Sequence, residues 1–281
     1  MKLHRDTAEI FVPDGLPHGE ALMRTTHLAV SAHQDDIEIM AACPILECFQ
    51  RSDRWFTGVV VTDGRGSPRN GIYEQYNDEE MRLVRIKEQR KAAVLGEYAA
   101  QIMLDYPSSE VKGGSVAPVE DLAAILKTTR PQQVYTHNLA DKHDTHVAVA
   151  LKLVAAIRSL PKNERPQKLY GCEVWRGLDW LVDSDKVGFD LSRQENLQAA
   201  LLGVFDSQIS GGKRYDLASL ARRRANATYF ESHGVDMSTG LSFGMDMTAL
   251  ILEDGPAPLG FIQEYLQRFM QDVTDRLQRV S

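Results

Sequence analysis

Residues 32–38 read Ala-His-Gln-Asp-Asp-Ile-Glu, which places one imidazole and three carboxylates in a single short stretch. A surface loop rarely gathers adjacent carboxylates beside an imidazole, because like charges repel unless a cation lies among them. Neutral imidazole and carboxylate are both good zinc ligands, and a catalytic zinc typically keeps three protein ligands and one water. The stretch therefore indicates part of a divalent-metal site, with His33 and Asp36 as ligands.

A pair of histidines far along the chain can complete this site. His143 and His146 are three positions apart where a helix is predicted to begin, and positions i and i+3 share one helix face. One histidine of this pair would be the third ligand. Asp35, beside the ligands, would then accept a proton from the metal-bound water, whose pKa the metal lowers to roughly 7.

Each motif also has a purely structural interpretation. A lone His-x-x-His pair is commonly a pair of surface residues, and an aspartate after a strand often caps a helix because its side chain accepts a backbone N–H bond. Capping does not require histidines, however. The two motifs together, at the ends of two predicted strands, therefore favour the metal site.

The elements that must position these residues alternate between strand and helix. Such alternation predicts a Rossmann-like α/β fold, an open and mostly parallel sheet with helices on both faces. Ligands bind such sheets at the carboxyl ends of the strands, so residues 32–38, 62–64 and 137–146 are expected to converge. The predicted strands are 27–32, 56–62, 101–106 and 133–137, and the predicted helices are 37–50, 77–96, 118–129 and 145–160.

The pattern is less regular after residue 161. A strand is predicted at 168–175, and helices at 192–205, 214–232 and 261–280. The last of these is amphipathic, and it would either cover the sheet or mediate a homo-oligomer. We expect a single domain over residues 1–281, with the metal-site core at about 25–160 and a substrate-specificity region at about 161–281.

Composition excludes several classes of protein. A net charge of −7 argues against a general nucleic-acid binder, and the basic stretch at 221–225 is expected to be a solvated helix face. No apolar run approaches the length of a membrane span, and no signal peptide is evident. Three cysteines without a Cys-x-x-Cys pair favour a reducing compartment, so a cytoplasmic location is expected.

The two motifs resemble those of a known family. Residues 32–38 resemble the AHPDDxE signature of the LmbE/PIG-L family of zinc-dependent N-acetylglucosaminyl deacetylases, and His-Asp-Thr-His at 143–146 occupies the place of its HPDH motif. Residues 85–96 resemble the family's RxxExxxAxxxLG helix, residues 62–64 fit its second loop, and residues 205–208 resemble its YxSQ element. The resemblance covers roughly residues 25–210.

The resemblance implies a hydrolase of linear amide bonds that removes an N-acyl group, usually acetyl, from an amino-sugar or glycoconjugate substrate. It implies Zn²⁺ as the cofactor, although another divalent metal would also suit the ligands. Carried over by position, the roles are His33, Asp36 and His146 as metal ligands, Asp35 as general base, His143 as second catalytic residue, and Arg85 as a substrate contact, to which we add Asp141.

Two positions depart from the family pattern. Gln34 replaces a proline, which should loosen the turn after the strand. Thr145 stands where the family has an aspartate, the natural partner for orienting His143 and raising its pKa. Asp141 is the candidate substitute, because the adjacent residue Asp144 faces another side of the helix.

Other functions remain open at this point. A dinucleotide-binding protein would need a GxGxxG turn where this chain has Ala-His-Gln-Asp-Asp, and two aspartates would repel a pyrophosphate. The alternatives that the ligands leave open are an amidase or phosphoesterase of the same fold and a non-catalytic metal-binding relative. The loop at 65–76 is either a lid over the site or a surface excursion.

Overall fold

The computed structural model describes residues 1–252 and 254–281. Within this part, eight strands form one sheet in the order β1-β4-β3-β2-β5-β6-β8-β7. The strands β4, β3, β2, β5 and β6 run parallel, whereas β1, β8 and β7 pair antiparallel with their neighbours. The strands are β1 (Glu9–Phe11), β2 (His27–Ser31), β3 (Phe56–Thr62), β4 (Ala100–Tyr106), β5 (Gln133–His137), β6 (Lys168–Cys172), β7 (Lys186–Asp190) and β8 (Leu241–Asp246).

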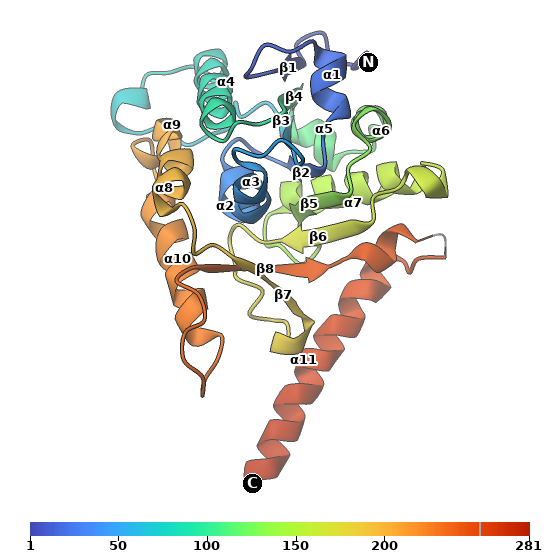
Figure 1. Ribbon diagram of the computed structural model, residues 1–281, viewed down its shortest axis with the longest axis vertical. Coiled ribbons are helices and arrows are strands. Elements are labelled where there is room, and N and C mark those ends of the chain that lie inside the picture. The colour runs from blue at the N-terminus through green and yellow to red at the C-terminus, as the bar shows by residue number, and fades with distance from the viewer. Residues whose placement is uncertain (253) are drawn as a thin grey trace.

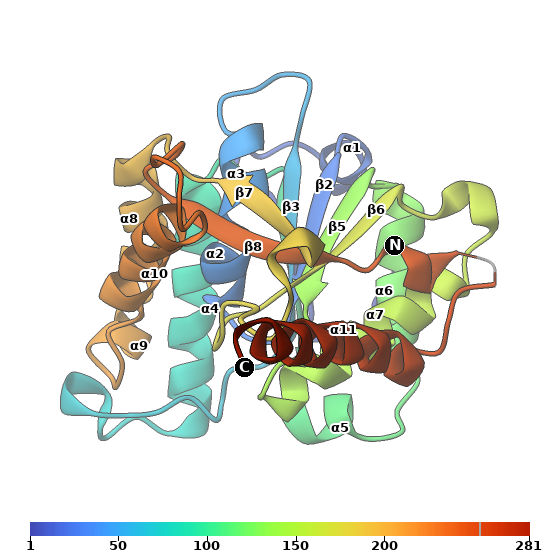
Figure 2. The same cartoon turned by 90° about the horizontal axis from the view of Figure 1, so that it is seen from below.

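Helices cover both faces of this sheet, as the sequence predicts. Figure 2 shows α6, α7 and α11 on one side of the sheet and α2, α4, α8 and α10 on the other. Each layer has its own apolar core against the sheet. The helices are α1 (His18–Met23), α2 (Asp36–Met40), α3 (Ala42–Cys48), α4 (Asp78–Leu95), α5 (Ser108–Lys112), α6 (Ala117–Thr129), α7 (Asp144–Arg158), α8 (Glu195–Gly203), α9 (Asp206–Ile209), α10 (Tyr215–Tyr229) and α11 (Pro258–Val280).

The central strands are buried along their whole length. All seven residues of β3 and all five of β2 are buried, which is typical of parallel strands covered on both faces and explains their continuous apolar runs. Helix α4 follows with a capping box, in which Asn77 and Glu80 satisfy each other's backbone N–H groups, a pattern that fixes a helix start. The apolar runs and the capping box in the sequence therefore predict the ends of β2, β3 and α4 to within one residue.

Four expectations need correction in detail. The helix expected at 37–50 is two helices, and α2 ends at Met40, because Pro44 lacks an N–H and its ring would clash with the carbonyl four residues earlier. The strand expected at 168–175 ends at Cys172, and the helix expected at 192–205 spans Glu195–Gly203. The sequence pattern also misses β7 and β8, whose glycines weaken the strand signal.

The basic stretch at 221–225 is only partly a solvated face. Arg223 is buried and donates to the backbone carbonyls of Glu38 and Ile39, near the end of α2. Arg222 donates to the carbonyls of Val174 and Arg176. These two guanidinium groups thus attach α10 to the elements around the sheet, and this is why they lie in an otherwise polar helix.

Helix α11 leaves the body of the molecule. Figure 1 shows its first turns against the sheet region and the remainder extending away to the C-terminus. None of the helices in the described part of the chain is long and apolar enough to cross a membrane.

Candidate active site

The turn after β2 holds its residues in an unusual backbone conformation. Asp35 has φ 92° and ψ −30°, a region that residues other than glycine rarely adopt and that is characteristic of functional sites. Asp35 stands at the N-cap position of α2, yet no side-chain capping bond forms there. Asp36 instead accepts a bond from the backbone N–H of His33 at 2.8 Å, and its Oδ2 lies 3.1 Å from Nδ1 of the His33 ring. Helix capping therefore does not explain the paired aspartates.

Gln34 fixes this turn rather than loosening it, which corrects the expectation from the missing proline. Its side chain is buried and donates to the carbonyl of Thr62 at 3.2 Å. Its backbone carbonyl accepts a bond from Arg85. Gly64 lies so close that a Cβ there would meet the Gln34 side chain at 2.5 Å, and its φ of +71° also favours glycine. The ends of β2 and β3 are thereby joined.

Three ligand atoms from the two motifs lie close together. His33 Nδ1 is 3.1 Å from Asp36 Oδ2 and 3.3 Å from His146 Nε2, and the last two atoms are 3.4 Å apart. Zinc bonds of 2.0–2.1 Å in tetrahedral geometry separate neighbouring ligand atoms by about 3.3 Å. The three atoms therefore form a triangle of the size that one face of such a site requires. The residues fit a divalent metal.

Asp141 orients one of these ligands. Its Oδ2 lies 3.1 Å from His146 Nδ1, so that ring donates from Nδ1 and leaves the lone pair of Nε2 facing His33 and Asp36. Such a carboxylate–histidine pair commonly fixes the tautomer of a metal-ligating histidine. Asp141 is buried and bonds to histidines rather than lining the cavity, which does not suit the substrate contact expected of it.

The carboxylates and histidines of this cluster shift one another's pKa values. Burial alone would raise the pKa of Asp36, but His146, His137 and His33 outweigh it and hold that pKa well below its usual value. Burial would likewise lower the pKa of His146, but the carboxylates of Asp36 and Asp141 raise it. The site is therefore built to keep Asp36 ionised.

His143 borders the cluster without a carboxylate of its own. Its ring lies 4.6 Å from that of His146 and 5.1 Å from that of His33. In the described part of the chain, its buried Nδ1 has no hydrogen-bond partner, and Asp141 accepts only its backbone N–H. Burial and the neighbouring His146 and His33 lower the pKa of His143. Asp141 therefore does not replace the missing aspartate at Thr145.

His137 belongs to the site, although the sequence only placed it near the rim. It is fully buried and stacks on His146 with ring centres 3.8 Å apart. Its Nε2 accepts the backbone N–H of Ala32 at 2.8 Å, which occupies the nitrogen that faces Asp36. Burial lowers the pKa of His137 to about 4, so the ring is neutral and supports His146 and the end of β2. In the sequence, what indicated this role of His137 was its position at the end of a predicted strand.

Asp35 and Arg85 lie beside the ligand cluster. Asp35 Oδ2 is 3.5 Å from Arg85 Nη2. Burial raises the pKa of Asp35 to about 8, Arg85 opposes this rise, and Asp36 adds to it. The Glu38 carboxylate accepts bonds from Gln89 and Tyr98.

Arg85 is positioned by its neighbours on α4, the helix that resembles the family's RxxExxxAxxxLG motif. Glu88, one turn along α4, lies 3.5 Å from Arg85 and accepts the backbone N–H and hydroxyl of Ser207 at 2.6 and 2.7 Å. Ser207 belongs to the stretch at 205–208, so two motifs far apart in the sequence meet here. This contact fixes α9 against α4 and places Gln208 at the cavity.

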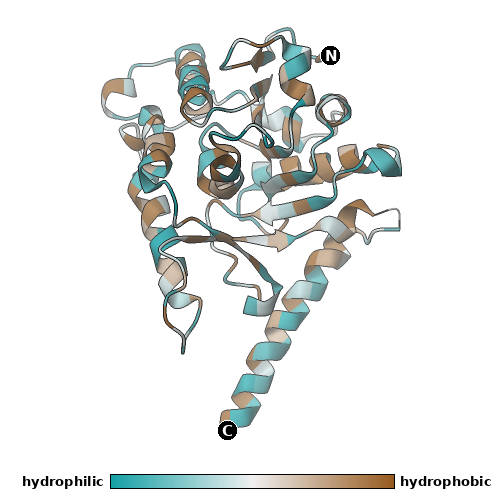
Figure 3. Cartoon of the chain, viewed as in Figure 1, coloured by the Kyte–Doolittle hydropathy of each residue, from teal (hydrophilic) through white to brown (hydrophobic). Residues whose placement is uncertain are grey.

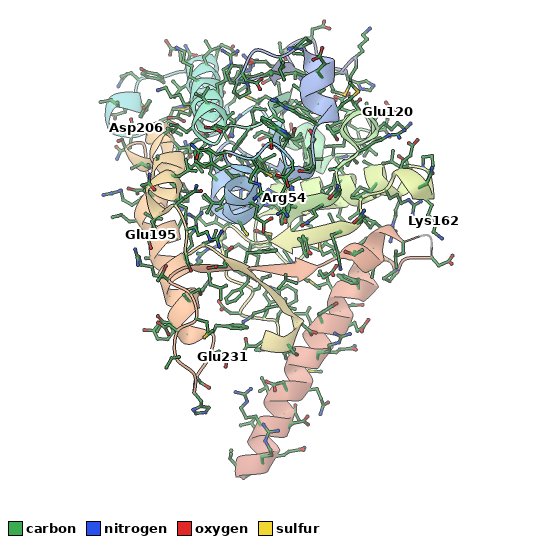
Figure 4. The ribbon with its side chains drawn as sticks, in the orientation of Figure 1. Arg54, Glu120, Lys162, Glu195, Asp206 and Glu231 are labelled. Carbon is green, nitrogen blue, oxygen red and sulfur yellow. The ribbon has the colours of Figure 1, made fainter. Side chains whose placement is uncertain are left out.

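The cluster opens into a cavity of about 420 Å³, a size typical of small-molecule sites. The loop at 65–76, for which both a lid and a surface excursion were open, contributes Gly66, Ser67 and Pro68 to the lining, and it is anchored where Tyr73 donates to Asp206 at 2.6 Å. In Figure 4, Asp206 lies at the edge of the molecule where α9 meets this loop. The lining residues are His33, Asp35, Asp36, Ile39, Asp63, Gly64, Gly66, Ser67, Pro68, Arg85, Ser108, Lys112, His143, Thr145, His146, Val174, Trp175, Gln208, Lys213 and Tyr215.

Comparison with known proteins supports the family resemblance. The family model described as PIG-L, GlcNAc-PI de-N-acetylase, matches residues 28–157. No curated protein matches the chain.

Several solved structures share the fold at low sequence identity. N,N'-diacetylchitobiose deacetylase from Pyrococcus horikoshii is 18% identical with a TM-score of 0.60, over 78% of this chain and 83% of that one. The 4-carboxy-2-hydroxymuconate hydratase GalB from Pseudomonas putida KT2440 is 16% identical with a TM-score of 0.57, over 78% and 95%. The zinc-inhibited form of teicoplanin deacetylase Orf2 is 13% identical with a TM-score of 0.57, over 79% and 97%. These likenesses confirm the α/β fold.

Proposed function

Because residues 28–157 of this chain belong to the PIG-L (LmbE-like) family, we propose that the protein is a metal-dependent hydrolase that removes an N-acyl group, in the first instance acetyl, from an amino-sugar-type substrate. The observation that carries this proposal is the triangle of ligand atoms from His33, Asp36 and His146 beside the cavity. The solved deacetylases of the same fold add support.

His33, Asp36 and His146 would hold the cation, which we propose to be Zn²⁺ or another divalent metal. When bound, it would polarise the acyl oxygen and lower the pKa of a water molecule. Asp141 would keep His146 in the ligating tautomer, and His137 would support the ring from its other side.

Asp35 is the proposed general base. It would accept a proton as the water oxygen attacks the acyl carbon, and pass that proton to the nitrogen as the C–N bond breaks, so that a carboxylic acid and an amine are formed. A cation beside it lowers the pKa of a carboxylate, which counteracts the effect of burial on Asp35. Arg85 acts in the same direction from 3.5 Å.

His143 is the proposed stabiliser of the acyl oxygen as negative charge develops there. A neutral imidazole can donate one hydrogen bond, and one well-placed donor contributes on the order of 3 kcal/mol to such a step. The lowered pKa of His143 favours this neutral donor over the imidazolium. Proton delivery to the amine is therefore assigned to Asp35.

The far wall of the cavity suits a sugar. Trp175 lines it, with Lys213 Nζ 4.5 Å from the centre of its ring and the centre of the Tyr215 ring 5.9 Å away. An aromatic side chain offers an apolar face with polar groups beside it, a combination that small-molecule sites use to orient a ligand. The region after residue 161, which supplies these residues, would thus determine substrate choice. We further propose that the chain forms one domain and that the protein is cytoplasmic.

The test is release of amine and acetate from N-acetylglucosamine and its methyl glycoside by purified protein. We expect activity that is lost with a chelator and restored by one equivalent of zinc. Asp35→Asn should keep the metal and lose turnover by about 10²-fold or more. The double variant His33→Ala/His146→Ala should lose both metal and activity.

Four results would contradict the proposal. Asp35→Asn with near-normal turnover would show that Asp35 is not the base. Bound metal without hydrolysis on a broad panel of N-acyl amines would identify a non-catalytic relative, and hydrolysis of phosphoesters instead would assign a different reaction. An unchanged zinc content in the double histidine variant would remove the proposed ligand set.

A further inference from the structure

Helix α11 carries an apolar surface that its own chain does not cover. Its first turns pack against the core through Phe261, Ile262 and Tyr265. The helix has 23 residues, so it is about 35 Å long, and residues 273–281 are all exposed. Figure 1 shows this distal part extending beyond the rest of the molecule.

The exposed apolar residues of α11 form one continuous stripe, which we call the α11 seam. At 100° per residue they fall within an arc of about 80°, beside the face that packs on the body. Figure 3 shows hydrophobic segments recurring along the helix. The seam consists of Leu259 (71% exposed), Leu266 (44%), Met270 (63%), Val273 (41%), Leu277 (61%) and Val280 (80%).

The spacing of the seam is that of a coiled coil. Leu259, Leu266, Val273 and Val280 recur every seven residues, and Met270 and Leu277 fill the alternate position of the same repeat. An apolar repeat of this period brings two helices together along a narrow strip. A helix that merely covered the sheet would bury this stripe against its own chain, whereas here only the edge of the stripe in line with Ile262 meets the body and the rest of the stripe stays exposed.

The charges of α11 indicate what kind of partner fits. The helix carries three acidic and three basic residues, and Glu264–Arg268 and Asp272–Arg276 pair within the helix. A membrane-surface helix has a polar face rich in Lys and Arg, which α11 lacks. Because α11 carries no net charge, it does not favour an oppositely charged partner. The same uncharged apolar stripe on a second copy of the chain is the best match.

The area is sufficient for a reversible dimer. Six half-exposed or exposed large apolar side chains offer on the order of 100 Å² each. Two copies would then bury about 1,200 Å², the lower limit for a specific interface. We propose that the α11 seam is an interface between two copies of this chain, which pair through their projecting C-terminal helices.

The test measures the mass of the full-length protein in solution by light scattering across roughly a hundredfold range of concentration. We expect a concentration-dependent dimer. Met270→Glu/Leu277→Glu places two charges in the seam and should leave a monomer. Gln271→Glu/Gln278→Glu adds the same charges, seven residues apart, outside the seam and should still dimerise.

A cross-link provides a positive readout. Val273 is the midpoint of Leu266–Val280, the part of the seam beyond the first turns of α11. It therefore faces its own copy in a parallel pair, and also in an antiparallel pair centred on this part. The native cysteines Cys43, Cys48 and Cys172 are buried, and Val273→Cys should therefore give a disulfide-linked dimer on mild oxidation. Gln271→Cys should give none.

Three outcomes would overturn the proposal. They are a wild-type protein that stays monomeric over the whole range, a dimer that survives Met270→Glu/Leu277→Glu, and binding to phosphatidylserine vesicles that this double variant abolishes. Far-ultraviolet circular dichroism checks that each variant is folded, and we expect it to be, because Met270, Gln271, Val273, Leu277 and Gln278 are all exposed.

Discussion

At the scale of single residues, the geometry of the site depends on which histidine the Asp141 carboxylate bonds to. Asp141 gives its side chain to His146 and only accepts the backbone N–H of His143. The two histidines are therefore not equivalent, since His146 lies in the first turn of α7 and His143 is the extended residue that precedes this helix. His146 is oriented as a ligand, whereas His143 keeps a lowered pKa and a ring without a partner in the described part of the chain.

This geometry predicts a specific loss in Asp141→Asn. Removal of the charge should weaken metal binding by about ten- to hundredfold, because the partner of a ligating histidine sets its tautomer and basicity. Competition with a chelator of known affinity measures this. Asp144→Asn changes an exposed neighbouring carboxylate and should bind metal normally. Equal affinity in both variants would refute the role of Asp141.

At the scale of elements, the contact between α4 and α9 positions one wall of the cavity. Glu88 is buried and accepts two bonds from Ser207, at the start of α9. Burial raises the pKa of Glu88, and Arg85 and Ser207 oppose that rise. The short helix α9 therefore depends on this contact for its position.

We expect Ser207→Ala to lower the free energy of unfolding by about 1–2 kcal/mol, because it leaves a buried carboxylate with one bond fewer. Ser210→Ala is the matched control. Its hydroxyl also donates to a carboxylate, that of Asp206, but in an exposed position, and its effect should stay within about 0.5 kcal/mol. Urea unfolding measures both. A similar loss in the two variants would show that burial of the bond does not matter.

At the scale of the whole molecule, acid should destabilise the fold through His27. This residue of β2 is buried, and burial, aided by Arg54, lowers its pKa to about 4 from 6.5. Glu47 lies 3.5 Å from its ring, and Cys48 contacts it at 3.4 Å. The unfolded chain takes up a proton below pH 6.5, whereas the folded chain does so only near pH 4, so stability falls as the pH falls through this window.

The contribution of His27 amounts to about 2 kcal/mol at pH 5 relative to pH 7. His27→Gln should therefore lose about that much less stability than the wild type between these two pH values, as measured by urea unfolding. His18→Gln, at an exposed site, should lose as much as the wild type. If His27→Gln and the wild type lose the same amount, another group causes the acid sensitivity.

The sequence alone determined the parallel sheet and the location of the site. Strands such as 56–62 and 133–137 are identifiable because burial on both faces requires a continuous apolar run. The carboxyl ends of parallel strands meet at one edge, so residues 32–38 and 143–146 had to converge. The metal-binding role of His33, Asp36 and His146 stays a prediction that this convergence supports.

Only the tertiary structure decided how each side chain is used. The Asp141 side chain bonds to His146 rather than to His143, and the His137 ring stacks on that of His146. Gln34 holds the turn that it was expected to loosen. These contacts join elements far apart in the sequence, and a rotamer chosen by packing leaves no local pattern. The antiparallel strands β7 and β8 were hidden for the same reason, because their pairing stabilises glycine-bearing segments with little intrinsic strand preference.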